Sequence, residues 1–252
     1  VRGQIYAELG DFDTAAKHFD LVKPDFMNIN DYLYIMSFYT HHNMPDRAGD
    51  LKTKYTSRPS GMFLKEFNHI PDWSIYSGYK NALAFSLIQN VSHTQILMYS
   101  DMAMMMLRFA EITAPDLAKN IDAINYYLGQ FFYTNTGNYQ QHFDKISNNS
   151  PFYPFVALRN AEKTGNFTKL EQSLRDFPLF VPSVNKLVGH YIQTGNKRAA
   201  LRVINRAMDN KSLDNAGRAF FAKTRAQIHY SFGDYDAAQS DIKLASDNLK
   251  ID

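Results

Sequence analysis

Residues 191–204 read YIQTGNKRAALRVI, and this stretch contains the pattern that decides the fold. A run with helical periodicity ends at Gly195, and a second such run follows Asn196. Glycine readily adopts the left-handed conformation that closes a helix, and an Asn side chain can accept hydrogen bonds from the free N–H groups that open the next one. The stretch therefore predicts two helices joined by a tight turn.

The same turn occurs five times along the chain, each time as Gly followed by Asp or Asn and usually by an aromatic residue. The five glycines are Gly10, Gly137, Gly165, Gly195 and Gly233. Three copies carry Ala five positions after the glycine and a larger apolar residue nine positions after it: Ala15 and Phe19, Ala200 and Ile204, and Ala238 and Ile242. Recurrence of one pattern at fixed offsets is typical of repeat proteins. We therefore expect stacked helix pairs.

With its small residue, aromatic, Gly turn and Ala, the chain resembles the tetratricopeptide repeat (TPR) family, most closely in residues 3–22 and 226–245. The resemblance implies an all-α fold, a right-handed α–α superhelix of about seven to eight helix pairs of about 34 residues each. We expect one domain over residues 1–252. The loop TSRPSG at residues 56–61 could separate two sub-arrays. The expected helix pairs lie near residues 1–22, 30–55, 62–90, 94–113, 117–147, 152–178, 181–208 and 215–249.

Composition narrows the function without supplying one. The 252 residues include 27 Lys and Arg against 25 Asp and Glu, a formal charge of +2, and no cysteine. The weak charge argues against a nucleic-acid or membrane-surface binder, and the absence of cysteine excludes disulfides and thiol chemistry. The longest apolar run, residues 102–107, is far shorter than the roughly 20 residues of a membrane helix, so we expect a soluble chain.

The ends and composition of the chain say little about its origin. No targeting segment occurs in the sequence, which leaves cytosol and periplasm both open. Because the first residues already lie inside a repeat, we expect a piece of a longer protein. The Asn- and Tyr-rich composition suggests a bacterial source.

The search for chemistry gives a negative result. The chain has no glycine-rich nucleotide motif, no H-E-x-x-H and no G-x-S-x-G, so we expect neither an enzyme nor a cofactor. His41 and His42 are adjacent, and neighbouring side chains on a helix point about 100° apart, which disfavours a metal site. A solvated helix end is the better interpretation of that pair. His229 occupies an aromatic position of its repeat and is expected to be packed.

Two further helical patterns have both a structural and a functional interpretation. The methionines among residues 98–106 could form an adaptable binding surface, but Met102, Met106 and Phe109 have the spacing of a packed helix, so we favour core packing. Ser92 and Gln95 match a capping box that would open this helix. Arg198, Arg202 and Arg206 form an i, i+4, i+8 row that could hold phosphates or an acidic partner. We favour a solvated convex face for this row.

In the TPR family, the first helix of each pair lines a concave groove, and the resemblance places polar and aromatic residues there. The candidate partner-binding residues are Ser37, His41, Tyr126, Gln130, Tyr133, Arg159, Lys163, Gln193, Lys223, Gln227 and Tyr230. Tyrosines, amides and isolated cations suit an extended peptide, whose backbone the amides can bond. The Lys and Asn clamp with which some family members grip acidic C-termini is not present in paired form.

The sequence therefore predicts a protein–protein interaction scaffold that binds a peptide or partner protein of unknown identity. The alternative is an RNA-binding helical-repeat protein, because residues 182–208 also resemble a pentatricopeptide repeat. Such proteins need a basic face, and the formal charge of +2 argues against that alternative. An enzyme with a site in the groove is a third hypothesis, for which the sequence nominates no residue.

Overall fold

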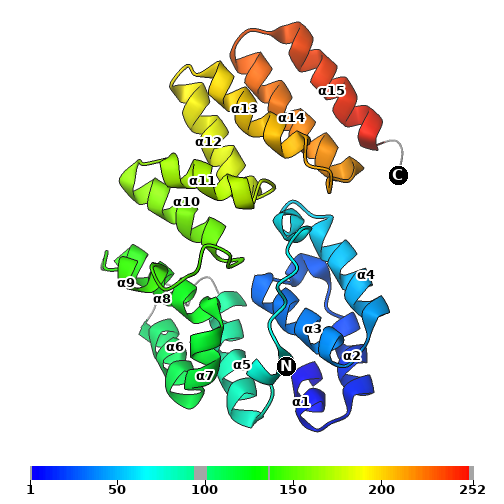
Figure 1. Ribbon diagram of the computed structural model, residues 1–252, viewed down its shortest axis with the longest axis vertical. Coiled ribbons are helices and arrows are strands. Elements are labelled where there is room, and N and C mark those ends of the chain that lie inside the picture. Colours follow the sequence, from blue (N-terminus) through cyan, green and yellow to red (C-terminus); the bar gives the residue numbers. More distant parts are fainter. Residues whose placement is uncertain (1, 94–100, 136, 250–252) are drawn as a thin grey trace. The chain divides into compact units, whose positions relative to one another are not determined.

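The computed structural model describes residues 2–93, 101–135 and 137–249, and within these ranges the chain is helical with no strand (Figure 1). The all-α prediction is therefore confirmed. The chain divides into two compact units: Val1–Lys54 with His69–Phe152, and Tyr55–Asn68 with Tyr153–Asp252.

The described residues of the first unit form nine α-helices and two 3₁₀ turns. They are α1 (Arg2–Glu8), α2 (Phe12–Asp20), η1 (Pro24–Phe26), α3 (Ile29–His41), α4 (Pro45–Thr56, with its last two residues in the second unit), η3 (Trp73–Ile75), α5 (Tyr79–His93), α6 (Asp101–Thr113), α7 (Pro115–Asn120), α8 (Asp122–Asn135) and α9 (Gln140–Phe143). Helix α5 is the hub of this unit, because it contacts α1, α3, α6, α7 and α8.

Aromatic rings fill the centre of the first unit. Tyr34 stacks on Phe85 with ring centroids 4.6 Å apart and meets Tyr76 edge-on at 5.2 Å, and Trp73 lies 5.3 Å from Phe38. All five rings are buried. Edge-to-face and stacked contacts of this kind add to the stabilisation from burial. Many of the aromatic residues therefore hold helices together.

The part of the second unit that the structure describes has three consecutive helix pairs and one 3₁₀ turn. They are η2 (Met62–Leu64), α10 (Tyr153–Thr164) with α11 (Thr168–Asp176), α12 (Val181–Gln193) with α13 (Lys197–Met208), and α14 (Asn215–Ser231) with α15 (Tyr235–Leu249). The first helices of the pairs also contact one another, α10 with α12 and α12 with α14 (Figure 1). Helices packed in adjacent pairs are compatible with a helical repeat protein.

The turn η2 joins the second unit although it precedes that unit's helices by about 90 residues. Phe63 packs edge-on against Phe180 and Phe155, with ring centroids 5.1 and 5.8 Å away. Lys65 Nζ lies 2.6 Å from Asp214 Oδ2, just before α14. Residues Met62, Phe63 and Leu64 are all buried. The core of this unit therefore depends on a segment from far upstream.

The predicted turns are confirmed. All five turn glycines have positive φ, between 69° and 77°, and Asn43 takes the same conformation at φ 54°. Asp11 and Asn196 cap the helices that follow, accepting from the backbone N–H groups of Thr14 and Ala199 at 3.1 Å. The alanines at the predicted small positions, Ala15, Ala200 and Ala238, are buried.

The middle of the chain departs from the expected pairs. In place of a helix pair over residues 62–90, the structure has two 3₁₀ turns and α5. Ser92 lies in the last turn of α5 and donates to the Gln89 carbonyl, so it does not open a helix. Gln95 and Met98 lie outside the described residues. Ile242, at the position that Phe19 and Ile204 occupy in their copies, is exposed, whereas those two residues are buried.

Candidate functional site

The first helices of the second unit expose polar side chains at the predicted binding positions. On α14, Lys223, Gln227 and Tyr230 follow an i, i+4, i+7 spacing that places them on one face, and all three are exposed. Lys163 on α10 and Gln193 on α12 are also exposed. Because α12 contacts both α10 and α14, the three helices form one layer. We call these five residues, with Arg159 of α10, the first-helix face.

Arg159 and Tyr230 of the first-helix face have intramolecular contacts. Arg159 is half-buried and forms an ion pair with Glu162, one turn along α10, at 2.8 Å. The ring of Tyr230 packs against the ring of Tyr235 on α15, with centroids 5.4 Å apart, while 67% of Tyr230 remains exposed. Tyr230 is therefore the large aromatic surface that this face offers to a ligand.

The candidate residues of the first unit are mostly packed. Ser37 and Gln130 are buried, and Ser37 Oγ and Gln130 Nε2 have no hydrogen-bond partner among the described residues. Tyr126 and Tyr133 are half-buried against Phe152 and Tyr139, with ring centroids 5.3 and 5.1 Å apart. His41 is exposed.

The prediction of one exposed face per first helix is wrong for α3, because neighbouring elements cover that helix on all sides. Its residues from Ile29 to Tyr39 are all buried. Ser37 and Gln130 are therefore left out of the surface proposed below.

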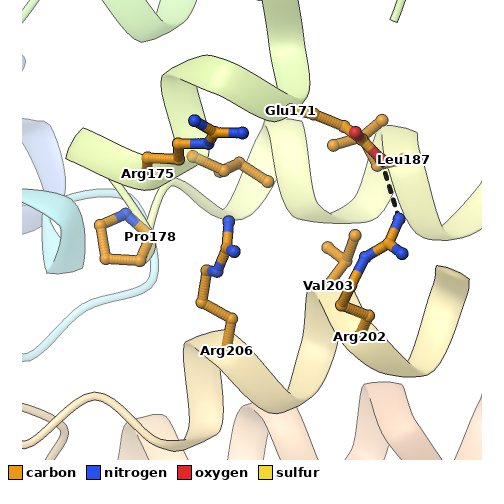
Figure 2. Close-up of a pocket in the computed structure, with 8 residues that line it drawn as sticks. Glu171, Arg175, Pro178, Leu187, Arg202, Val203 and Arg206 are labelled. Carbon is orange, nitrogen blue, oxygen red and sulfur yellow. Dashed lines mark ion pairs between the residues drawn. The ribbon is translucent and has the colours of Figure 1, made fainter. Parts of the chain in front are cut away.

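A cavity of about 160 Å³ lies between α11, α12 and α13 (Figure 2). Its apolar wall is made by Leu174, Pro178, Leu187 and Val203, and its polar lining is Glu171, Arg175, Arg202 and Arg206. We call it the arginine cavity. The three guanidinium groups come from two helices, Arg175 from α11 and Arg202 and Arg206 from α13.

The charges of the arginine cavity are only partly compensated. Arg202 lies 3.5 Å from the carboxylate of Glu171, which also accepts a hydrogen bond from the Tyr191 hydroxyl. That acceptor and the burial of the ring raise the pKa of Tyr191 to about 12, the burial being the larger cause. Arg175 and Arg206 extend into the same space, and neither forms an ion pair with any described residue (Figure 2).

The row of arginines on α13 was predicted to face solvent, and all three side chains are exposed. Arg198 lies outside the cavity, while Arg202 and Arg206 line it. Spacing along α13 could find these two side chains. It could not find Arg175, which belongs to another helix pair and meets them only through tertiary packing.

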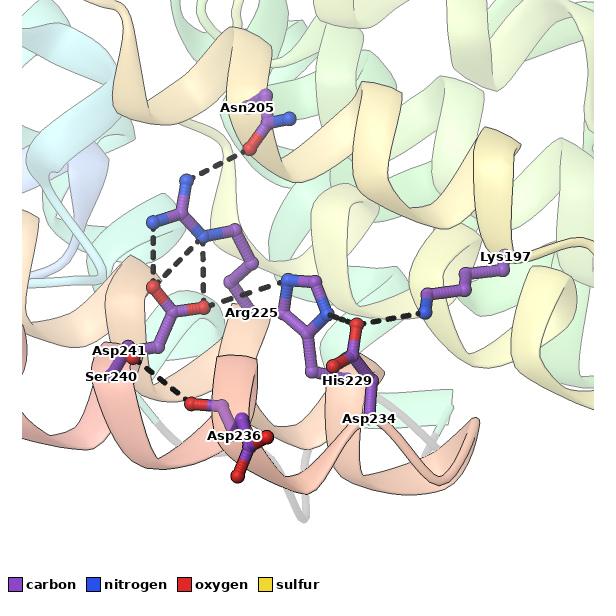
Figure 3. Close-up of polar contacts among 8 residues, drawn as sticks. All are labelled: Lys197, Asn205, Arg225, His229, Asp234, Asp236, Ser240 and Asp241. Carbon is purple, nitrogen blue, oxygen red and sulfur yellow. Dashed lines mark hydrogen bonds and ion pairs between the residues drawn. The ribbon is translucent and has the colours of Figure 1, made fainter.

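A second polar cluster joins α13, α14 and α15 (Figure 3). The Arg225 guanidinium binds both carboxylate oxygens of the buried Asp241 at 2.6–3.1 Å and donates to Asn205 Oδ1 at 3.1 Å. His229 lies 3.2 Å from Asp234, whose pKa is lowered chiefly by the hydrogen bond from Lys197. The predicted packed role of His229 is therefore confirmed. The shared hydrogen bonds make this cluster a clamp between helices.

The histidine pair before α4 is divided by its packing. His41 is exposed, while the ring of His42 packs on Phe12 at 3.9 Å, and burial lowers the pKa of His42. In the parts of the chain that the structure describes, no three His, Asp or Glu side chains come together as metal ligands. No helix within those parts combines the length and the apolar character that crossing a bilayer requires.

Helix α6 presents an apolar face to solvent, which reverses the predicted core packing of Met102 and Phe109. Ala103, Leu107 and Ala110 are buried, while Met102, Met105, Phe109 and Ile112 are 56–78% exposed. The two alanines on the buried side allow the neighbouring helices to approach closely around Leu107, and four bulky residues lie on the opposite side. Met106 is half-buried.

No family model, curated protein or solved structure matches this chain.

Proposed function

We propose that the protein is an interaction scaffold of the TPR type, and that its second unit binds an extended peptide of a partner protein along the first-helix face. The observation that carries the proposal is the row Lys223, Gln227 and Tyr230 on α14, which is exposed although it lies in the layer of first helices. In the TPR-like arrangement this layer would be the concave side of the superhelix.

The chemistry of the first-helix face suits a peptide in extended conformation. Gln193 and Gln227 each supply an amide that can donate to and accept from a peptide backbone. Tyr230 offers an aromatic surface with a polar tip, a combination enriched at interfaces. Lys163 and Lys223 add positive charge, so we expect the preferred peptide to carry at least one carboxylate.

The proposal is tested by changing the α14 row without disturbing the fold. Capture of partners from lysate would be compared for the wild type, the variant Lys223→Ala/Gln227→Ala/Tyr230→Ala, and a control with Gln239→Ala/Lys243→Ala on α15. All five residues are exposed, so each variant should keep its melting temperature to within a few degrees. We expect the control to capture the same partner as the wild type, and the α14 variant to lose it by about tenfold.

Two outcomes would contradict the scaffold proposal. One is capture by the α14 variant at the wild-type level, and the other is equal loss in the α15 control. If the α14 variant loses the partner and the α15 control keeps it, overlapping peptides of the partner are tested for binding. A single peptide should then reproduce binding to the wild-type protein.

RNA binding stays the alternative function, and the exposed arginines of α13 are the observation that favours it. It predicts a mobility shift with single-stranded RNA that weakens steeply as salt rises. Loss of that shift on neutralising Arg198 as well as Arg206 would support RNA over a peptide.

A further inference from the structure

We infer that the arginine cavity is a binding site for a phosphate monoester group, separate from the first-helix face. The inference starts from two arginines of the cavity that have no carboxylate partner among the described residues. Arg175 and Arg206 reach the same cavity from α11 and α13 and form no ion pair within the described residues. Two like charges directed into one space repel each other, and a bound anion removes that repulsion.

Three other arginines of the same unit are paired with carboxylates of the protein. Arg225 is held bidentately by Asp241, and Arg159 pairs with Glu162 on its own helix. Arg202 pairs with Glu171 at the edge of the cavity. Among the described residues Arg198 also has no ion pair, but it lies outside the cavity. Arg175 and Arg206 differ because two exposed guanidinium groups, neither with a described counter-ion, line one cavity.

Guanidinium geometry points to phosphate. The planar guanidinium fork of Arg donates two parallel N–H groups to two oxygens of one phosphate, and two forks together can satisfy a dianion. The apolar wall of Leu174, Leu187 and Val203 suits the carbon side of an ester. A volume of about 160 Å³ is below the roughly 300–1,000 Å³ of sites for drug-sized ligands, so a phosphate with a small organic group fits.

Acidic residues argue against a polyanion. Glu171 lies beside Arg202 at the cavity, and Asp209 lines the wider hollow that continues from Arg206. A nucleic-acid backbone would bring further phosphates toward these carboxylates. A single phosphate group between Arg175 and Arg206 brings none, and Arg202 compensates the charge of Glu171 inside the cavity. The ligand class is therefore a phosphate monoester, carried by a small molecule or by a phosphorylated side chain.

The test is a binding titration of the full chain by ³¹P NMR and calorimetry, with phenyl phosphate as the probe. We expect saturable one-to-one binding with Kd of about 0.1–1 mM, the range for so small a ligand. Arg175→Ala and Arg206→Ala should each weaken binding by about tenfold or more, because each removes charge-assisted hydrogen bonds. Arg198→Ala is the matched control, since Arg198 is an exposed arginine on the same helix outside the cavity, and binding should stay within about twofold.

A conservative variant separates binding from folding. Arg206→Lys keeps the charge and the apolar stem, so it should fold as the wild type does. It should still weaken binding several-fold, because an ammonium cannot form the bidentate contact. Removal of Arg175 or Arg206 should leave the melting temperature of the ligand-free protein unchanged or raise it, because a repulsion is lost.

The two sources of the phosphate group are distinguished by further arms of the titration. If inorganic phosphate and phenyl phosphate bind as tightly as a phosphoserine peptide does, the ligand is a small molecule. Tighter binding of that peptide than of both, with none by its unphosphorylated twin, would assign a modified side chain.

Three results would overturn the inference. They are no saturation by about 10 mM phenyl phosphate, equal weakening in Arg198→Ala, and displacement of phenyl phosphate only by single-stranded RNA that binds far more tightly. The first-helix face shares no residue with this cavity, so failure of one proposal leaves the other standing.

Discussion

A methyl group added to the middle of α8 should destabilise the first unit, because the position is already filled by a ring from α9. A Cβ atom at Gly129 would lie 2.2 Å from Phe143 Cε1 and 2.4 Å from its Cδ1. Phe143 is 2% exposed and packs against Tyr139 and Tyr126, with ring centroids 5.4 and 6.4 Å away, so it cannot move out freely. Overpacking of this kind costs about 1–3 kcal/mol.

The matched control is Gly49→Ala in α4, a helical glycine of the same unit with no atom within 4 Å of an added Cβ. It should gain up to about 1 kcal/mol, because Ala is the better helix former. Gly129→Ala has the same gain in helix propensity, but it also carries the steric cost of the overlap with Phe143. We therefore expect the free energy of unfolding to be lower in Gly129→Ala than in Gly49→Ala by about 1–3 kcal/mol.

Urea unfolding followed by tryptophan fluorescence measures this difference, because Trp73 is the single tryptophan and lies in the unit that contains both glycines. Phe143→Leu should restore part of the stability lost in Gly129→Ala by removing the ring. A Gly129→Ala variant as stable as Gly49→Ala would refute the close packing of α8 on α9.

Three further changes test the packing elsewhere. Ala200→Leu should lower the free energy of unfolding by about 1–3 kcal/mol, since Ala200 has no exposed surface; the measurement is a urea transition followed by circular dichroism. Asp241→Ala should cost about 3 kcal/mol by leaving Arg225 unpaired in the clamp, and Asp241→Ala/Arg225→Met should recover much of it in the same assay. Burial lowers the pKa of His142 in the folded protein. The unfolded chain therefore binds a proton at a higher pH than the folded chain does. As a result, stability falls as the pH drops from about 6.5 through the lowered pKa. His142→Phe, which keeps the stacking on Phe132, should flatten the decline in melting temperature between pH 7 and 5.

Local features of the fold follow from the sequence alone. The five Gly turns and the alanines after them were predictable because a left-handed residue and a close helix crossing each require a particular small side chain. The three helix pairs of the second unit fall close to their expected ranges for the same reason. Periodicity failed for residues 62–90, where two short 3₁₀ turns have too few residues to show any period.

Features that depend on tertiary partners could not be predicted. Ser37 was predicted to be exposed from its distance in sequence to the turn. In the structure, η3 and α5 cover α3, and both come from a part of the chain that has no repeat signal. Likewise, α6 has one buried and one exposed apolar face, and only its small residues mark which side packs. Arg175 and Arg206 are 31 residues apart in different helix pairs, and no spacing rule relates them.

The upstream origin of η2 affects how the second unit can be made and dissected. Its core includes Met62, Phe63 and Leu64, which belong to a segment that is synthesised long before α10 to α15. These side chains therefore cannot pack into the core until most of the chain has been synthesised. Contacts this distant in sequence slow folding through the entropy of closing a long loop. A fragment beginning at Tyr153 would lack the Phe63 ring and the Lys65 partner of Asp214. The residues that complete this unit are therefore separated from it by the whole of α5 to α9.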